Sequence, residues 1–131
     1  MILRLQKLRE KQFFCLGYLM GHGGSRASEY LKEHLFENLT KHPQFLKNTK
    51  LAISETYQQT DKEFLESEKD TFRDDGSTAS TAVLVGNHLY VANVGDSRTI
   101  ISKNGQQFPF LRIINQTEVM RERELKMLEV L

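Results

Sequence analysis

Two short stretches of this chain combine a flexible backbone with a side chain that can bind a metal or move a proton. The first is Gly21-His22-Gly23-Gly24, and the second is Val94-Gly95-Asp96-Ser97-Arg98. Glycines let backbone carbonyls and amides approach an ion or a phosphate, because no Cβ atom stands in the way. His22 can donate a proton to a leaving oxygen near neutral pH. Asp96 supplies the hard oxygen ligands that Mg²⁺ and Mn²⁺ prefer.

Each stretch also has a purely structural interpretation. Gly21 to Gly24 can be a turn that enters a helix, with a histidine that only packs against its neighbours. Asp96 can accept backbone amides in a β-turn, with Arg98 as its ion-pair partner. A third interpretation is a phosphate or nucleotide site that uses the glycines and the free amides of the following helix. Taken alone, each stretch favours the structural interpretation.

Two consecutive helices are predicted after the first stretch. Ser25 is placed to accept from the free amides of a starting helix. Side chains then recur at steps of three and four residues, which predicts one buried stripe: Ala27, Tyr30, Leu31, His34, Leu35 and Leu39. Pro43 ends this helix and suits the first turn of a second one, which continues to Glu68. Both helices are amphipathic, so they form a layer that lies on another element.

Strands are predicted from Ser77 onward, where threonine, valine and alanine dominate. A buried strand over Ser77–Val85 and a second over Leu89–Val94 are joined by a hairpin. Further elements are predicted closer to the carboxyl end: strands over 99–102 and 108–114, and a charged helix over 116–131. Helices followed by hairpins, without strict alternation, favour an α+β layered fold with an antiparallel sheet.

Composition narrows the function classes. The 131 residues carry a net charge of +1, which argues against nucleic acid or an anionic membrane as a partner. With 39% hydrophobic and 27% charged residues, the chain suits a soluble globular domain. The apolar run 13–20 is much shorter than a membrane span. The single cysteine, Cys15, cannot form an internal disulfide, so we expect an intracellular protein, cytoplasmic and/or nuclear. The oligomeric state is left open.

Taken together, several motifs resemble the metal-dependent Ser/Thr protein phosphatases of type 2C, the PPM family. Three of them carry the resemblance: Gly21-His22-Gly23-Gly24, Gly76-Ser77-Thr78-Ala79 and Val91-Ala92-Asn93-Val94-Gly95-Asp96-Ser97-Arg98. Segments 26–31 and 60–65 are similar to plant members, and the resemblance extends from Gly21 to about Gly105. It implies a sandwich of two antiparallel sheets with helix pairs outside. The predicted fold class is α+β, a partial PPM-type phosphatase fold: antiparallel sheet layers flanked by two antiparallel helices, an incomplete sandwich.

The resemblance also implies a reaction. In the family, two Mg²⁺ or Mn²⁺ ions activate a water molecule that attacks phosphoserine or phosphothreonine of a phosphoprotein substrate. By position, Gly21 would give its carbonyl to a metal, and His22 would be the general acid. Asp96 would bind an additional, more weakly held metal. Gly76 to Ala79 and Asn93 would be structural.

The chain departs from the family motif just before Gly21. The motif is Asp-Gly-His-Gly-Gly, and Met20 stands here in place of the aspartate. A thioether is a soft, neutral ligand and a poor partner for Mg²⁺. The family's upstream acidic residues and phosphate-binding arginine have no counterpart before Gly21. We therefore expect a Ser/Thr phosphatase by family whose activity is absent from this chain as written. The alternative is a non-catalytic pseudophosphatase fragment that binds a partner protein through its helix pair.

The ends of the chain suggest a change of reading frame. Codons for Phe-Gly-Ile-Phe-Asp-Gly, read one base later, encode Leu16-Gly17-Tyr18-Leu19-Met20, and similar shifts generate the carboxyl end. The predicted organisation is an out-of-frame segment over 1–20, a partial PPM-type phosphatase domain over 21–109 and an out-of-frame charged segment over 110–131. Genomic DNA without the in-frame family peptides would refute this interpretation.

Overall fold

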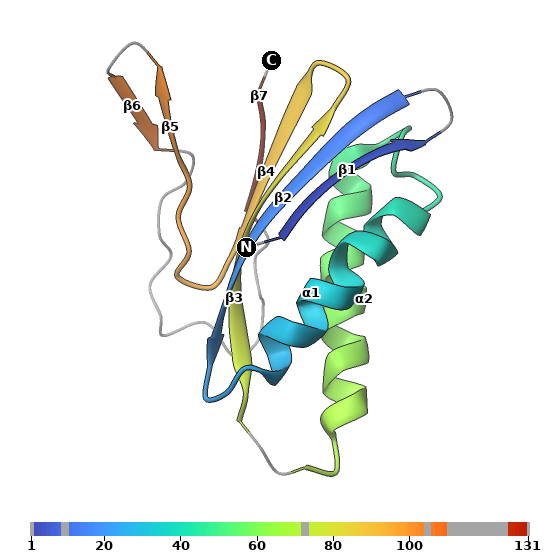
Figure 1. Cartoon of the computed structure of the whole chain (residues 1–131), viewed down its shortest axis with the longest axis vertical. Coiled ribbons are helices and arrows are strands. Elements are labelled where there is room, and N and C mark those ends of the chain that lie inside the picture. Colours follow the sequence, from blue (N-terminus) through green and yellow to red (C-terminus); the bar gives the residue numbers. More distant parts are fainter. Residues whose placement is uncertain (1, 9–10, 72–73, 104–105, 110–125, 131) are drawn as a thin grey trace.

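A computed structural model describes residues 2–8, 11–71, 74–103, 106–109 and 126–130 (Figure 1). The described elements, in chain order, are β1 (Ile2–Leu8), β2 (Lys11–His22), α1 (Arg26–Lys41), α2 (Thr49–Glu68), β3 (Gly76–Val85), β4 (His88–Val94), β5 (Ile100–Lys103), β6 (Gln106–Pro109) and β7 (Lys126–Val130). One antiparallel sheet has the strand order β1-β2-β3-β4-β7. The strands β5 and β6 pair only with each other.

Both helices lie against one face of the five-stranded sheet, while the β5–β6 hairpin stands apart on the other side (Figure 1). The alternation of side chains along β3 shows which residues face the helices. Ala79, Thr81, Val83 and Val85 are buried, and the residues between them are more exposed. This period of two is expected for a strand with one covered face. The order of helices and hairpins therefore predicts the α+β architecture correctly.

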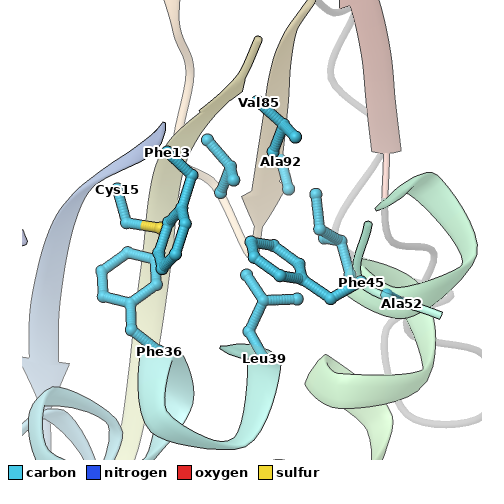
Figure 2. Packing of buried hydrophobic residues seen from close by; sticks show 10 residues of the cluster. Phe13, Cys15, Phe36, Leu39, Phe45, Ala52, Val85 and Ala92 are labelled. Atoms are coloured by element: carbon cyan, nitrogen blue, oxygen red, sulfur yellow. The ribbon is translucent and has the colours of Figure 1, made fainter. Parts of the chain in front are cut away.

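The core lies between the sheet and the helix pair (Figure 2). Its buried members come from β2, the two helices, the loop between them and strands β3 and β4: Phe13, Cys15, Phe36, Leu39, Phe45, Ala52, Ile53, Val83, Val85 and Ala92. The rings of Phe13 and Phe45 meet edge to face, with their centroids 5.1 Å apart. A Cβ atom on Gly17 would lie 3.1 Å from the ring of Phe36, so glycine at this position of β2 lets that ring approach the sheet. Burial of the large side chains is the main stabilising contribution.

Polar contacts also join the layers. The hydroxyls of Tyr57 on α2 and Thr81 on β3 are 2.5 Å apart, and burial raises the pKa of Tyr57. Between the helices, the Asn38 amide donates to Thr60 Oγ1 at 3.2 Å and to Glu63 Oε2 at 3.1 Å. These bonds satisfy polar groups in a largely covered region, where an unpaired donor or acceptor would be costly. None of the described helices is long and apolar enough to cross a bilayer.

The helix ends differ in detail from the sequence prediction. Ser25 stands before α1, but its side chain makes no capping bond; instead its carbonyl accepts from Ser28 Oγ at 2.8 Å. Pro43 lies in the turn between the helices and not in the first turn of α2. The cap of α2 is Asn48, whose side chain accepts from the backbone N–H of Leu51 at 3.2 Å. Asparagine is among the favoured N-cap residues, so this bond explains where α2 begins.

The strands predicted over Ser77–Val85 and Leu89–Val94 are confirmed as β3 and β4, joined at Gly86 and Asn87. The strand predicted over 99–102 is β5, and the one over 108–114 overlaps β6, with residues 110–114 outside the described part. The helix predicted over 116–131 is wrong for 126–130, which form β7 on the edge of β4. Pairing with unpaired backbone groups of an edge strand outweighs the helical preference of this short stretch. Residues 116–125 lie outside the described part.

The amino-terminal strands occupy a region that the sequence prediction left without structure. Residues 2–8 form β1, and residues 11–22 form β2, which lies between β1 and β3 in the sheet. Phe13 and Cys15 of β2 are part of the core. The interpretation of segments 1–20 and 110–131 as out-of-frame translations concerns the DNA and stays a prediction.

Candidate functional site

The two turns that carry the candidate residues lie at the same end of the sheet. β2 ends at His22, opposite Gly76, and β4 ends at Val94, opposite Ala79. Because β2 and β4 both run antiparallel to β3, their carboxyl ends meet the same edge. The two ends are separated by two strand spacings, about 10 Å, across the sheet, and by the three residues from Gly76 to Ala79 along β3. The sheet therefore brings the turns to one edge without placing His22 and Asp96 in contact.

Close packing explains the glycines of the first turn. A Cβ atom on Gly21 would lie 2.4 Å from the carbonyl oxygen of Gly24. On Gly23, where φ is +75°, it would lie 2.5 Å from the carbonyl oxygen of Asp74. On Gly24 it would lie 2.7 Å from Asp75 Oδ2. The turn is folded on itself and packed against residues 74 and 75. A side chain does not fit at Gly21 or Gly23, where it would meet backbone oxygens, whereas at Gly24 it would displace the Asp75 carboxylate.

An open pocket of about 660 Å³ lies at this turn. It is lined by His22, Gly23, Gly24, Ser25, Arg26, Asp74 and Asp75. His22 and Asp74 are exposed, whereas Arg26 and Asp75 are half-buried. The pocket thus combines an imidazole with one cationic and two acidic side chains. Asp96 is not part of its lining.

Three residues of this pocket were not among the candidates predicted from the sequence: Arg26, Asp74 and Asp75. The signal that could have found them is the pairing of β2 with β3, which sets His22 opposite Gly76. Because of this register, the residues just before Gly76 lie beside those just after His22.

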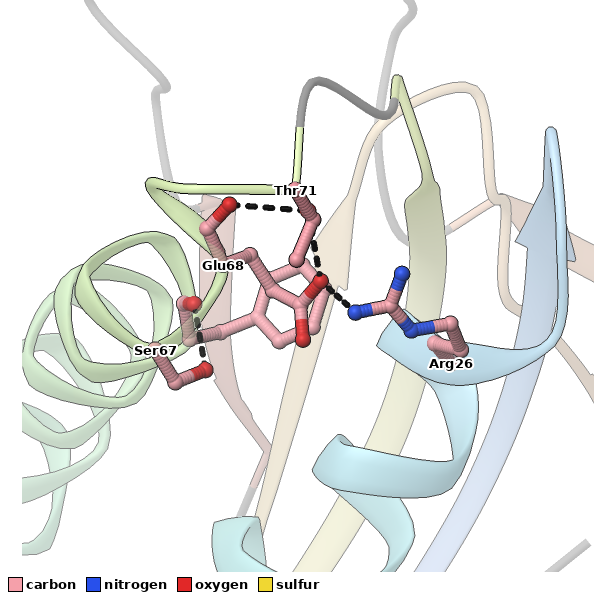
Figure 3. A network of polar contacts seen from close by, with 5 residues as sticks. Arg26, Ser67, Glu68 and Thr71 are labelled. Carbon is pink, nitrogen blue, oxygen red and sulfur yellow. Dashed lines mark hydrogen bonds and ion pairs between the residues drawn. The ribbon is translucent and has the colours of Figure 1, made fainter.

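Arg26, which lines the pocket, is engaged in an ion pair with Glu68 (Figure 3). Its guanidinium contacts Glu68 Oε2, and the same carboxylate oxygen accepts from Thr71 Oγ1 at 3.0 Å. The backbone N–H and the hydroxyl of Thr71 also donate to the Glu68 carbonyl, at 3.0 and 2.8 Å. This network joins the first residue of α1 to the end of α2. It fixes the start of α1 and occupies the one cationic side chain of the pocket.

The second turn is attached to β3 and β4. φ at Gly95 is +77°, and a Cβ atom there would lie 3.0 Å from Thr78 Cγ2. Beyond the turn, Thr99 Oγ1 lies 2.6 Å from Ser80 Oγ and donates to Asn93 Oδ1 at 2.8 Å. The exposed side chain of Asp96 therefore sits on a turn whose two ends are fixed to the sheet.

The start of β3 holds the first turn as well. Ser77 Oγ donates to the Met20 carbonyl at 3.1 Å, just before Gly21. Ser77, Thr78 and Ser80 thus contact both turns from a single strand. These contacts give the serine- and threonine-rich segment a structural role, which is the role that the family resemblance implies for Gly76 to Ala79.

The donors at this edge do not fit a pair of hard divalent cations. Met20, 55% exposed, offers a neutral sulfur, and Gly21 offers only its carbonyl. Within the described part of the chain, no three His, Cys, Asp or Glu side chains are grouped so that they could hold a metal ion. Two such cations require several oxygen ligands, most of them carboxylates. Metal ligation by Gly21 and Asp96 and proton donation by His22 stay predictions.

Comparison with known proteins identifies the family. The model of the family "Protein phosphatase 2C" matches residues 3–126. Rice (Oryza sativa subsp. japonica) Probable protein phosphatase 2C 52 is 71% identical over 104 residues, which cover 79% of this chain and 21% of that protein. Arabidopsis thaliana Probable protein phosphatase 2C 76 is 76% identical over 98 residues, 74% of this chain and 23% of that protein. The chain therefore belongs to the protein phosphatase 2C family, and spans less than a quarter of these two curated relatives.

Solved structures show the same fold. Serine-threonine phosphatase 2C from Toxoplasma gondii matches with a TM-score of 0.62 at 20% identity, over 90% of this chain and 50% of that one. PppA, described as a key regulatory component of T6SS in Pseudomonas aeruginosa, matches with a TM-score of 0.64 at 17% identity, over 98% and 63% of the two chains. The predicted α+β fold, a partial PPM-type phosphatase fold, is confirmed.

Proposed function

We propose that this chain forms part of a protein serine/threonine phosphatase domain, and that the 131 residues alone do not hydrolyse phosphoserine. The family match over residues 3–126 carries the first part of the proposal. The family is metal-dependent and acts on phosphoproteins; for this protein we propose Mg²⁺ or Mn²⁺ as the ion. The donor set at the edge of the sheet supports the second part.

Within this proposal, His22 is the general acid. It is exposed at the end of β2, on a turn that the glycines pack tightly against residues 74 and 75. A fixed turn holds the imidazole in one place, which is what proton donation to the leaving serine oxygen requires. The ion pair with Glu68 leaves Arg26 to position the start of α1, not to bind phosphate.

A chimera tests the phosphatase assignment. Residues 21–103 of this chain replace the matching segment of rice Probable protein phosphatase 2C 52, which supplies its own residues before and after. We expect phosphate release from a phosphoserine peptide, with Mn²⁺, within about tenfold of the parent protein, because the exchanged segment contains both turns and the strand β3 that contacts them. His22→Ala in the chimera should lower the rate by about 100-fold or more, the usual contribution of a general acid.

His88→Gln in the same chimera is the matched control, because His88 begins β4 at the far end of that strand from Asp96. We expect it to retain the rate of the chimera. An inactive chimera, measured together with an active parent protein, would contradict the assignment. Equal rates for the His22→Ala and His88→Gln chimeras would also contradict it.

The second candidate is a non-catalytic module that binds a partner protein through the helix pair. The observation that favours it is the shortage of metal donors, together with Leu51 and Leu65 on α2, which are 42% and 52% exposed. Hydrolysis of p-nitrophenyl phosphate by this chain with Mn²⁺, abolished by His22→Ala, would exclude it.

A further inference from the structure

Met20 lies near the end of β2, one residue before the first turn. It is opposite Thr78 in the β2–β3 register, and the methyl of Thr78 lies against Gly95. Its position alternates with the core residues of β2, so its side chain is on the face away from the helices, where it is 55% exposed. Met20 and the turn of Asp96 therefore flank the same threonine.

The other carboxylates near this edge are engaged elsewhere or face other parts of the turn. Glu68 is paired with Arg26. Asp75 lies against Gly24, and the carbonyl of Asp74 lies against Gly23, so both belong to the pocket beyond the turn. Asp96 is the exposed carboxylate on the turn that packs against Thr78, the residue opposite Met20. One carboxylate and a backbone carbonyl are too few hard donors for Mn²⁺ or Mg²⁺.

We infer that Met20 is the residue that denies this edge of the sheet a divalent-cation site. An aspartate at position 20 would place a second carboxylate two strand spacings, about 10 Å, from the turn of Asp96. Two short acidic side chains can close that span around a cation, with metal–oxygen distances of about 2.2 Å. Methionine offers one neutral sulfur there, which hard cations do not favour. The inference rests on the proposed function, because the metal dependence of the family gives the site its meaning.

The experiment measures Mn²⁺ binding to the full chain by loss of the free-ion electron paramagnetic resonance signal. We expect the unaltered chain to bind with a dissociation constant no tighter than about 1 mM. Met20→Asp should bind at least tenfold more tightly, whereas Met20→Leu should bind like the unaltered chain. Adding Asp96→Asn to Met20→Asp should remove the gain, because the site then loses its second carboxylate.

Three results would overturn the inference. The first is stoichiometric, tight uptake of Mn²⁺ by the unaltered chain. The second is a folded Met20→Asp variant that binds Mn²⁺ no better than the Met20→Leu variant. The third is a gain in Mn²⁺ affinity from Met20→Asp that persists when Asp96→Asn is added. Met20→Glu provides a second acidic variant if Met20→Asp does not fold, with folding checked by circular dichroism. The chimera above begins at residue 21 and excludes Met20, so it can fail or succeed independently of this measurement.

Discussion

The carbonyl oxygen of Asp74 lies 2.5 Å from the place that a Cβ atom would take on Gly23, where φ is +75°. Both the backbone angle and the lack of space therefore require glycine at this position. Two other glycines separate the effect of the backbone angle from the effect of close packing. Gly86 has φ of +60° with no atom within 4 Å of the Cβ position, and Gly76 has neither a positive φ nor a close neighbour. The structural requirement for glycine therefore decreases from Gly23 to Gly86 to Gly76.

Alanine substitutions should reproduce that series. We expect Gly23→Ala to lower the free energy of unfolding by at least about 2 kcal/mol, from strain plus overpacking. Gly86→Ala should cost about 1 kcal/mol, from the left-handed backbone alone. Gly76→Ala should stay within about 0.5 kcal/mol of the unaltered chain. Urea denaturation followed by circular dichroism measures all three, and equal losses for Gly23→Ala and Gly76→Ala would show that the turn is not packed as described.

At this scale the sequence proposed three candidates, Gly21, His22 and Asp96, and their roles stay predictions. Glycine-flanked acid–base side chains can be recognised from local spacing, and the family resemblance implied the role of Gly21. The sequence did not nominate Arg26 or Asp75. Their places depend on the β2–β3 register and on an ion pair that spans 42 positions, from Arg26 to Glu68, and local patterns contain neither.

Among the elements, β3 is the one on which the site depends, since it contacts both turns and pairs with β2 and β4. The contact of Tyr57 with Thr81 joins the same strand to α2. Burial raises the pKa of Tyr57 above its ordinary value of 10, although the bond to Thr81 acts in the opposite direction. Stability should therefore depend on pH in the alkaline range.

The sign follows from the protons bound by each state. Below pH 10, Tyr57 keeps its proton in the folded and the unfolded chain, and stability is unaffected. Above pH 10 the unfolded chain releases a proton that the folded chain retains, so stability falls by about 1.4 kcal/mol per pH unit. Tyr57→Phe should cost about 1 kcal/mol near pH 8, from the lost hydrogen bond, but should show a shallower decline above pH 10.

Urea unfolding between pH 8 and pH 11 measures these slopes. Tyr18→Phe is the matched control, because Tyr18 is 55% exposed on the opposite face of the sheet. Parallel pH profiles for Tyr57→Phe and the unaltered chain would refute the coupling of Tyr57 to folding.

The sequence predicted some elements better than others for physical reasons. α1 and α2 were predicted from helical spacing, and β3 and β4 from their content of threonine, valine and alanine and the hairpin between them; the predicted types agree with the structure. β2 was not predicted, since its apolar run lacks a clear period of two and one of its two partner strands, β3, lies more than 50 residues away. The charged segment at 126–130 looks helical in isolation but pairs with β4. Long-range strand pairing therefore accounts for both errors.

For the molecule as a whole, the two faces of the sheet differ. One carries the core and the helix pair, whereas Tyr18, Met20 and Leu84 on the other face are 55%, 55% and 39% exposed. The chain spans half of the Toxoplasma gondii phosphatase and about a fifth of the rice relative. Exposed apolar side chains on one sheet face favour association, so measurements on this chain belong at low protein concentration.

The central claim is that β2 folds in one cooperative unit with β3 and β4, because His22, Gly21 and Met20 are placed only through that pairing. β2 and β3 each have a neighbouring strand on both sides. Native-state hydrogen exchange of the backbone amides tests this directly. We predict that amides of residues 15–19 and 81–85 exchange with the same free energy, that of global unfolding. Exchange of residues 15–19 at the rate of an unfolded peptide, while residues 81–85 stay protected, would contradict the account.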